Sequence, residues 1–131
     1  MKKISVIIIG GGGRGTIYSQ HLQKIMEKAE VTAIAEPRAY FRDRIADMHN
    51  IPQENRCSDW HELAKRPKFA DAVIITTQDR MHLEPAVAFA NLKYDILIEK
   101  PLAPDMIECR DLIAAAEQNN IILQIFQNFL I

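Results

Sequence analysis

The sequence predicts an α/β fold in which helices cover both faces of a doubly wound parallel sheet, giving three layers, α/β/α, in a single domain. Two observations lead to this fold class. Short apolar runs alternate with helical patterns along the 131 residues, and such alternation is typical of parallel sheets. The first apolar run also leads directly into a cluster of glycines, which fits a tight turn between a strand and a helix.

The individual elements follow from the apolar runs and their spacing. Residues 4–9 form an Ile/Val run that contains one serine. Such a run is expected for a strand buried on both faces. Ile51-Pro52 breaks the pattern, and Asp59 is placed to cap a short helix. The expected strands are residues 4–9, 31–35, 72–76, 95–99 and 121–126, and the expected helices are residues 16–28, 38–49, 60–65, 81–92 and 105–119.

Composition and charge exclude several classes of protein. With 48% apolar and 25% charged residues the chain has ordinary globular usage, and its 16 basic against 17 acidic residues give a net charge of -1. No basic patch is present to attract nucleic acid or an anionic membrane, so neither is an expected partner. Cys57 and Cys109 are too few and too far apart for a metal cluster, and we expect reduced structural thiols and no metal.

Targeting signals are also not expected. The first apolar run stops in glycine after six residues, without a cleavage-type region. No stretch approaches the roughly 18 apolar residues of a membrane-spanning helix. The expected compartment is therefore the cytoplasm.

All five glycines of the chain lie between positions 10 and 15. Gly10, Gly12 and Gly15 match the pattern G-x-G-x-x-G between a strand and a helix, which is typical of a dinucleotide-binding, Rossmann-like turn. The first glycine permits the tight turn, the second lets the backbone approach a pyrophosphate, and the third lets helix and strand pack closely. Gly13 reduces bulk further, and we include Arg14 among the coenzyme-binding residues. The alternative is a purely structural tight turn.

A carboxylate follows at the end of the second expected strand. Glu36 lies 21 residues after Gly15, where the pattern calls for an acid that accepts hydrogen bonds from the adenosine ribose. Such an acid favours NAD, because it repels a 2′-phosphate. Arg38 leaves NADP possible, since its guanidinium could pair with a 2′-phosphate, stack on adenine or form a solvated surface charge.

Residues 99–103, Glu-Lys-Pro-Leu-Ala, end the fourth expected strand, where ligand chemistry sits in such sheets. Together with the glycine turn, Glu36, Asp59-Trp60 and residues 77–82, Thr-Gln-Asp-Arg-Met-His, they give the chain its likeness to a known family. The sequence resembles the Gfo/Idh/MocA oxidoreductases, which oxidise sugars, polyols and related hydroxy compounds with NAD(P). The resemblance covers essentially the whole chain but only the N-terminal half of a family member.

The resemblance implies roles for individual residues. It places Lys100 beside the nicotinamide, as the catalytic residue in substrate binding and proton transfer. It places Thr77 and Gln78 near the ribose and nicotinamide, and a histidine such as His82 is frequent at its position. We add Thr76 and Glu99 to the coenzyme-binding residues. Taken alone, the polar residues after the third strand could equally be turn or cap residues, and Trp60-His61 is assigned no chemistry.

Two departures from the family pattern lead to further expectations. The family usually has a glycine before the Glu-Lys-Pro strand, so here Asn91 or Lys93 must terminate the preceding helix. Family enzymes also continue into a second α/β domain, whereas this chain stops at Ile131 after an apolar segment. We therefore expect residues 1–131 to form a dinucleotide-binding domain, with the substrate domain absent. We expect this domain to be catalytically inactive by itself and able to self-associate.

Two other functions stay open on the sequence. One is a stand-alone dinucleotide sensor or partner subunit without turnover. The other is a methyltransferase-like domain that uses S-adenosylmethionine, although that function gives no reason for Glu-Lys-Pro.

Overall fold

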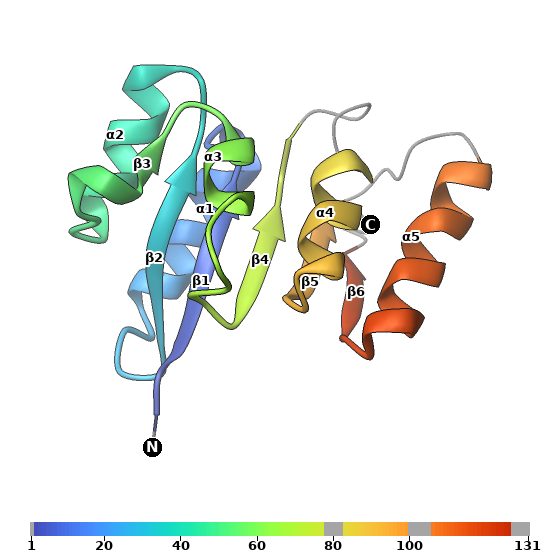
Figure 1. The fold of residues 1–131 in the computed structure, drawn as a ribbon. Helices are drawn as coiled ribbons and strands as arrows, with labels where there is room; N and C mark the ends of the chain where they lie inside the picture. The colour runs from blue at the N-terminus through green and yellow to red at the C-terminus, as the bar shows by residue number, and fades with distance from the viewer. Residues whose placement is uncertain (1, 78–82, 100–105, 127–131) are drawn as a thin grey trace, which may run out of the picture.

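The fold is built on a six-stranded, fully parallel sheet, seen in a computed structural model that describes residues 2–77, 83–99 and 106–126 (Figure 1). The strand order is β3-β2-β1-β4-β5-β6, as in a doubly wound dinucleotide-binding sheet. The strands are β1 (Ile4–Ile9), β2 (Ala29–Ala35), β3 (Arg56–Cys57), β4 (Ala72–Ile75), β5 (Asp95–Glu99) and β6 (Leu123–Phe126).

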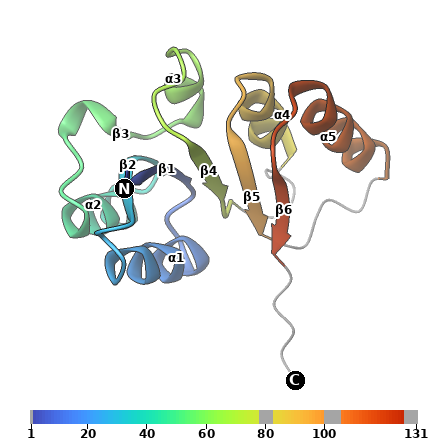
Figure 2. The ribbon, with the colours of Figure 1, turned by 90° about the horizontal axis from the view of Figure 1, so that it is seen from below.

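Helices cover both faces of the sheet, which confirms the predicted three layers. In the view from below, α1 and α2 lie on one side of the sheet and α3, α4 and α5 on the other (Figure 2). The helices are α1 (Gly13–Gln23), α2 (Ala39–Met48), α3 (Trp60–Ala64), α4 (Leu83–Asn91) and α5 (Met106–Asn119), with a single 3-10 turn, η1 (Gln53–Asn55).

Two hydrophobic clusters form the core, one on each face of the sheet. Ile7 and Ile9 of β1 belong to the cluster that includes Phe89 of α4, whereas Ile8 belongs to the cluster that includes Ile45 of α2. Successive side chains of a strand point to opposite faces, so the unbroken apolar run of β1 supplies both clusters. All five side chains are buried, as expected for a strand covered on both faces.

The predicted boundaries differ most from the structure around helix α1, and strand β6 begins at Leu123 instead of residue 121. Helix α1 begins at Gly13 instead of residue 16 and ends at Gln23 instead of residue 28. The following residues tighten into turns, and β2 begins already at Ala29, which pairs with Ile4 of β1. Residues 24–28 of the predicted helix therefore lie in turns, and β2 begins two residues earlier than predicted. The sequence also gave no sign of β3, because a two-residue strand is too short to carry a periodic pattern.

The end of helix α4 confirms that Lys93 takes the place of a terminating glycine. Lys93 has φ +71°, and its N–H bonds to the Ala90 carbonyl while the Tyr94 N–H bonds to the Phe89 carbonyl. This is the Schellman arrangement, in which a left-handed residue satisfies the last carbonyls of a helix. The rings of Phe89 and Tyr94 meet edge to face at 5.3 Å and complete it. Asn50 and Asn120 end α2 and α5 with the same backbone bonds.

Candidate functional site

A cavity of about 960 Å³ opens at the carboxyl end of the sheet, where the chain leaves β1, β2, β3 and β4. Strands β2 and β4 flank β1, and the connections after β1 and β4 carry helices on opposite faces. Ligands of open α/β sheets bind in the crevice at such a switch point. Eight of the predicted coenzyme-binding residues line this cavity, namely Gly10, Gly12, Gly13, Arg14, Glu36, Arg38, Thr76 and Thr77.

The glycine turn after β1 forms the floor of the cavity. Gly10 has φ +97°, a conformation that side chains other than glycine rarely adopt, and a Cβ there would lie 2.9 Å from the backbone of Thr76 and Thr77. A Cβ on Gly15 would lie 2.1 Å from the Gly10 carbonyl oxygen. These two glycines therefore have the predicted roles in the tight turn and in close packing of α1.

Gly12 and Gly13 instead face open space. A Cβ on Gly12 would meet only the end of the Arg38 side chain, at 3.1 Å, and a Cβ on Gly13 would meet nothing within 4 Å. Both residues stand at the N-terminus of α1, where backbone N–H groups have no partner within the helix. The turn thus leaves an open cradle at a helix N-terminus, which suits a phosphate group in size and charge.

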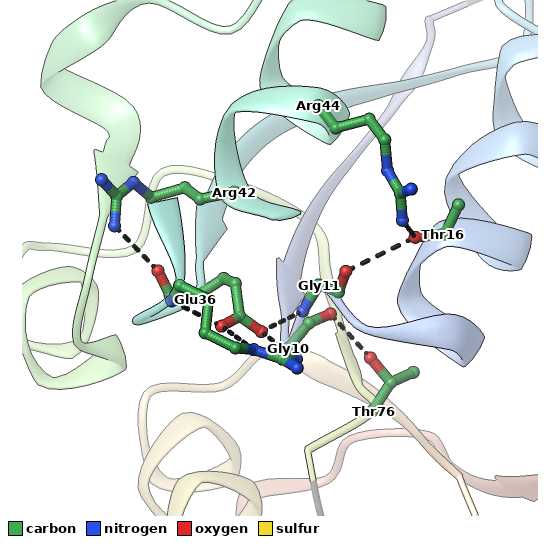
Figure 3. A network of polar contacts seen from close by, with 8 residues as sticks. Gly10, Gly11, Thr16, Glu36, Arg42, Arg44 and Thr76 are labelled. Carbon is green, nitrogen blue, oxygen red and sulfur yellow. Dashed lines mark hydrogen bonds and ion pairs between the residues drawn. The ribbon is translucent and has the colours of Figure 1, made fainter. Parts of the chain in front are cut away.

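Gly11 is a member of the site that the sequence pattern did not single out. Its N–H donates to Glu36 Oε1 at 2.8 Å, and a Cβ on Gly11 would lie 3.1 Å from Glu36 Cγ. The glycine turn and the end of β2 are therefore joined by a direct bond, shown in Figure 3. The pattern G-x-G-x-x-G does not require glycine at position 11. A glycine there was therefore the signal in the sequence that this position, too, has little room for a side chain.

Glu36 is 3% exposed and is held by the protein on both carboxylate oxygens. Besides Gly11, the Arg38 N–H donates to Oε2 at 2.7 Å, and the Arg38 guanidinium donates to Oε2 at 3.0 Å and to Oε1 at 3.1 Å. Burial alone would raise the pKa of Glu36, but these hydrogen bonds outweigh it and hold the pKa below its ordinary value. Glu36 is thus an anion at neutral pH, fixed at the cavity wall.

Arg38, for which the sequence left three roles open, makes two contacts within the chain. Its guanidinium forms an ion pair with Glu36, and the guanidinium carbon lies 4.3 Å from the centre of the Phe41 ring. The side chain is nevertheless 53% exposed. Arg38 therefore stands at the cavity mouth with two partners, both within the chain.

Further hydrogen bonds brace the turn from both sides. Thr76 Oγ1 donates to the Gly10 carbonyl at 2.8 Å, and Thr16 Oγ1 donates to the Gly11 carbonyl at 3.4 Å (Figure 3). Arg44 donates to Thr16 Oγ1 at 2.8 Å, and Arg42 donates to the backbone carbonyl of Glu36 at 3.0 Å. Thr76 thus has a structural bond in addition to its place at the cavity.

The cavity is also lined by residues outside the glycine turn and the end of β2. They are Asp59, Trp60 and His61 at the start of α3 and Glu84 of α4. Asp59 caps α3 as predicted, accepting from the His61 N–H at 2.9 Å, and its Oδ1 lies 2.6 Å from His61 Nδ1. Glu84 Oε1 lies 3.5 Å from His61 Nε2. The hydrogen bond that the His61 ring donates to Asp59 raises the pKa of His61. Sequence reasoning gave Trp60 and His61 no part in the site, because only the fold brings them to the cavity.

Glu99 ends β5 and is buried against helix α1. It accepts a hydrogen bond of 2.5 Å from the Tyr18 hydroxyl, and its Oε1 lies 3.5 Å from Arg14 Nε. Burial and this hydrogen bond raise the pKa of Tyr18. Glu99 is not among the described residues that line the cavity, so its contacts indicate a positioning role at the strand end. The predicted residues Gln78, His82 and Lys100 lie outside the described residues.

The described residues show neither a metal site nor a membrane-spanning helix. No three His, Cys, Asp or Glu side chains come together there as a metal site would require. Within the same residues, no helix combines the length and apolar content needed to cross a membrane. Cys57 is a buried free thiol whose pKa burial raises to about 11.

Comparison with known proteins identifies the family. The family model described as an oxidoreductase family with an NAD-binding Rossmann fold, that of the Gfo/Idh/MocA proteins, matches residues 4–127. The chain belongs to the Gfo/Idh/MocA oxidoreductase family. The family is described as having an NAD-binding Rossmann fold, and the fold predicted from the resemblance is confirmed.

Several Gfo/Idh/MocA relatives are similar in sequence over most of this chain. Myo-inositol 2-dehydrogenase of Thermotoga maritima is 31% identical over 88% of the chain and 34% of its own length. An NADP(+)-dependent scyllo-inositol 2-dehydrogenase of Bacillus subtilis is 34% identical over 75% of the chain and 29% of its own length. The chain spans about a third of the length of these relatives.

Solved Gfo/Idh/MocA structures agree with the fold. A probable dehydrogenase from Thermotoga maritima has a TM-score of 0.81 at 27% identity and covers 93% of this chain and 35% of its own. The WlbA dehydrogenase from Bordetella pertussis, solved with NADH and UDP-GlcNAcA, has a TM-score of 0.85 at 17% identity and covers 95% of this chain and 37% of its own. The second likeness concerns the fold alone.

Proposed function

We propose that the cavity holds NAD(H) as the coenzyme half of an oxidoreductase that acts on a sugar, polyol or related hydroxy compound. The observation that carries the proposal is the open cradle at Gly12 and Gly13 beside the buried anion of Glu36. The backbone N–H groups at the start of α1 would hold the pyrophosphate, and Glu36 would accept from the ribose hydroxyls. The names of the inositol dehydrogenase relatives support the substrate class.

When bound, the nicotinamide supplies the hydride acceptor. The residues of this chain have to bind and orient it and to hold a proton at the reacting hydroxyl. We propose that Lys100, as a neutral amine, takes the proton of the reacting hydroxyl, and that the ammonium group so formed polarises the developing carbonyl oxygen. Glu99, the residue before it, is fixed by Tyr18 and Arg14 of α1, so the end of β5 is anchored to the helix that begins at the glycine turn. Thr77 and Gln78 keep their proposed place near the ribose and nicotinamide, and His82 stays a proposed coenzyme-binding residue.

We propose further that residues 1–131 act as a dinucleotide-binding domain whose substrate pocket is completed by a second domain. The length of the relatives supports this, since this chain matches about a third of each. Self-association stays a prediction, and so does a cytoplasmic location, with which the buried free thiol of Cys57 is compatible. Gel filtration and cell fractionation test these two points.

Titration with NADH, followed by nicotinamide fluorescence, tests the proposed coenzyme site. Gly12→Val is the informative variant, because a Cβ at this position meets only the movable end of Arg38 and a larger side chain there would fill the cradle. We expect micromolar binding by the unaltered chain and at least a tenfold weaker affinity in Gly12→Val, with an unchanged circular dichroism spectrum. Equal affinity in the two proteins would refute the assignment of the cradle to the pyrophosphate.

A further inference from the structure

We propose that Arg44 of α2 is a positioning residue of the coenzyme site, which acts through Thr16 to hold the peptide bond before Gly12 in the orientation that binds the pyrophosphate. This inference rests on the proposed function, since it concerns how the same cradle binds its phosphate. Arg44 is not among the described residues that line the cavity. Its effect on the coenzyme therefore has to pass through the residues that it contacts.

The first feature that carries the proposal is a chain of hydrogen bonds that starts at Arg44. Its Nη2 donates to Thr16 Oγ1 at 2.8 Å, and Thr16 Oγ1 donates to the Gly11 carbonyl at 3.4 Å (Figure 3). Because the hydroxyl oxygen accepts from the guanidinium, its one hydrogen is left for the carbonyl. Arg44 thus sets the direction of the Thr16 O–H bond, and hydrogen bonds linked in this way strengthen each other.

The second feature is the peptide to which the Gly11 carbonyl belongs. In a planar trans peptide the C=O and the following N–H point in opposite directions, so a bond that holds the Gly11 carbonyl also fixes the N–H of Gly12. The preceding peptide has both of its groups bonded, to Thr76 Oγ1 and to Glu36 Oε1. For the Gly12 N–H the described residues provide no acceptor, and Gly12 lines the cavity. This N–H is therefore available to a phosphate oxygen.

The third feature is the charge near the start of α1. The first turn of α1 holds no acidic residue, and the Arg44 guanidinium is bonded to Thr16 near the start of that helix. A positive charge beside a helix N-terminus opposes the helix dipole, and it becomes favourable when an anion binds there. The rings of Tyr40 and Phe41 hold the charge in place, since the guanidinium carbon lies 5.5 Å from one ring centre and 5.1 Å from the other. The arrangement is therefore more favourable with a pyrophosphate bound than without one.

The test measures the binding of ADP-ribose and of adenosine by NMR titration of the isotope-labelled chain at neutral pH. Both ligands contain adenosine, and only ADP-ribose carries the pyrophosphate. We expect Arg44→Met to weaken ADP-ribose binding about fivefold, as for the loss of one hydrogen bond, and to change adenosine binding less than about twofold. Thr16→Val should have the same effect, because it removes the hydroxyl and keeps the shape of the side chain. Arg44→Lys keeps a charged donor and should recover most of the affinity for ADP-ribose.

Two further variants show whether the effect passes through Thr16. The double variant of Arg44→Met and Thr16→Val should bind ADP-ribose no more weakly than either single variant, because both changes break the same chain of bonds. Lys24→Met is the matched control, since it removes one positive charge at the exposed C-terminal end of α1. It should leave both affinities unchanged. Circular dichroism checks the fold of each variant, and Thr16→Val decides the question by itself if Arg44→Met does not fold.

Each other outcome overturns a defined part of the reasoning. Unchanged ADP-ribose binding in the single variants, or equal weakening of ADP-ribose and adenosine, would overturn the role proposed for Arg44. Additive losses in the double variant would mean that Arg44 acts without Thr16, which contradicts the chain of bonds. An equal loss in Lys24→Met would reduce the effect to net charge and overturn the positioning role. If the folded, unaltered chain binds neither ligand, the proposed function itself fails, and the role of Arg44 fails with it.

Discussion

Gly15 offers a sharp test of how the glycine turn is built. A Cβ at this position would lie 2.1 Å from the Gly10 carbonyl oxygen and 3.0 Å from Thr76 Oγ1, whereas ordinary contact begins at 3.4 Å. In Gly15→Ala the helix and the turn must therefore move apart by more than 1 Å, which strains the bond from Thr76 to the Gly10 carbonyl. Overpacking costs about 1–3 kcal/mol, and a lost hydrogen bond costs about 1 kcal/mol more.

Helix propensity opposes these costs, because alanine is favoured over glycine within a helix by about 1 kcal/mol. We expect Gly15→Ala to lower the free energy of unfolding by about 2 kcal/mol. Gly13→Ala is the matched control in the same helix, where a Cβ meets nothing within 4 Å. It should raise the free energy of unfolding by about 0.5 kcal/mol.

Urea unfolding followed by far-UV circular dichroism measures both variants. The opposite signs are the decisive feature, since any general effect of adding a methyl group near the turn would move both in the same direction. If Gly15→Ala unfolds within about 0.5 kcal/mol of the unaltered chain, or if the two variants change stability equally, the close packing of α1 on the turn is not what requires glycine there.

Two further predictions concern the end of α4 and the wall of the cavity. Lys93→Gly should raise the free energy of unfolding by up to about 1 kcal/mol in the same urea experiment, because Lys93 has φ +71° and glycine adopts that conformation without strain. Lys93→Ala is the control and should not raise the free energy of unfolding, because alanine has the same backbone strain at positive φ. In Asp59→Asn the cap of α3 is kept but the charge beside His61 is lost, so the pKa of His61, raised by Asp59 in the unaltered chain, should fall toward its ordinary 6.5. Because the folded-state pKa of His61 is the raised one, the stability from this ion pair is present below the ordinary pKa of histidine, while Asp59 is ionised, and is lost as pH rises through the folded-state pKa. NMR titration of the His61 ring checks the shift, and an identical pKa in the two proteins would contradict the pairing.

The sequence alone determined the fold class and much of the coenzyme turn. The unbroken apolar run of β1, the G-x-G-x-x-G spacing and the acid at the end of β2 are local signals, since each depends on residues near one another in the chain. The requirement for glycine at Gly10 and Gly15 could be predicted for the same reason, and so could the need for Asn91 or Lys93 to end α4. Local patterns fix what a residue can do with its own backbone and its nearest neighbours.

Only the tertiary structure decided which groups meet at the cavity. Gly11 bonds to Glu36 across 25 positions of sequence, and Tyr18 bonds to Glu99 across 81. His61 reaches the cavity because β3 is added at the edge of β2 and directs α3 toward the site. The order of strands in the sheet sets these distances, and that order is not encoded in the periodicity of any one segment. Arg38 shows the consequence, since the sequence left three roles open and only the structure shows its guanidinium paired with Glu36 and placed over the Phe41 ring.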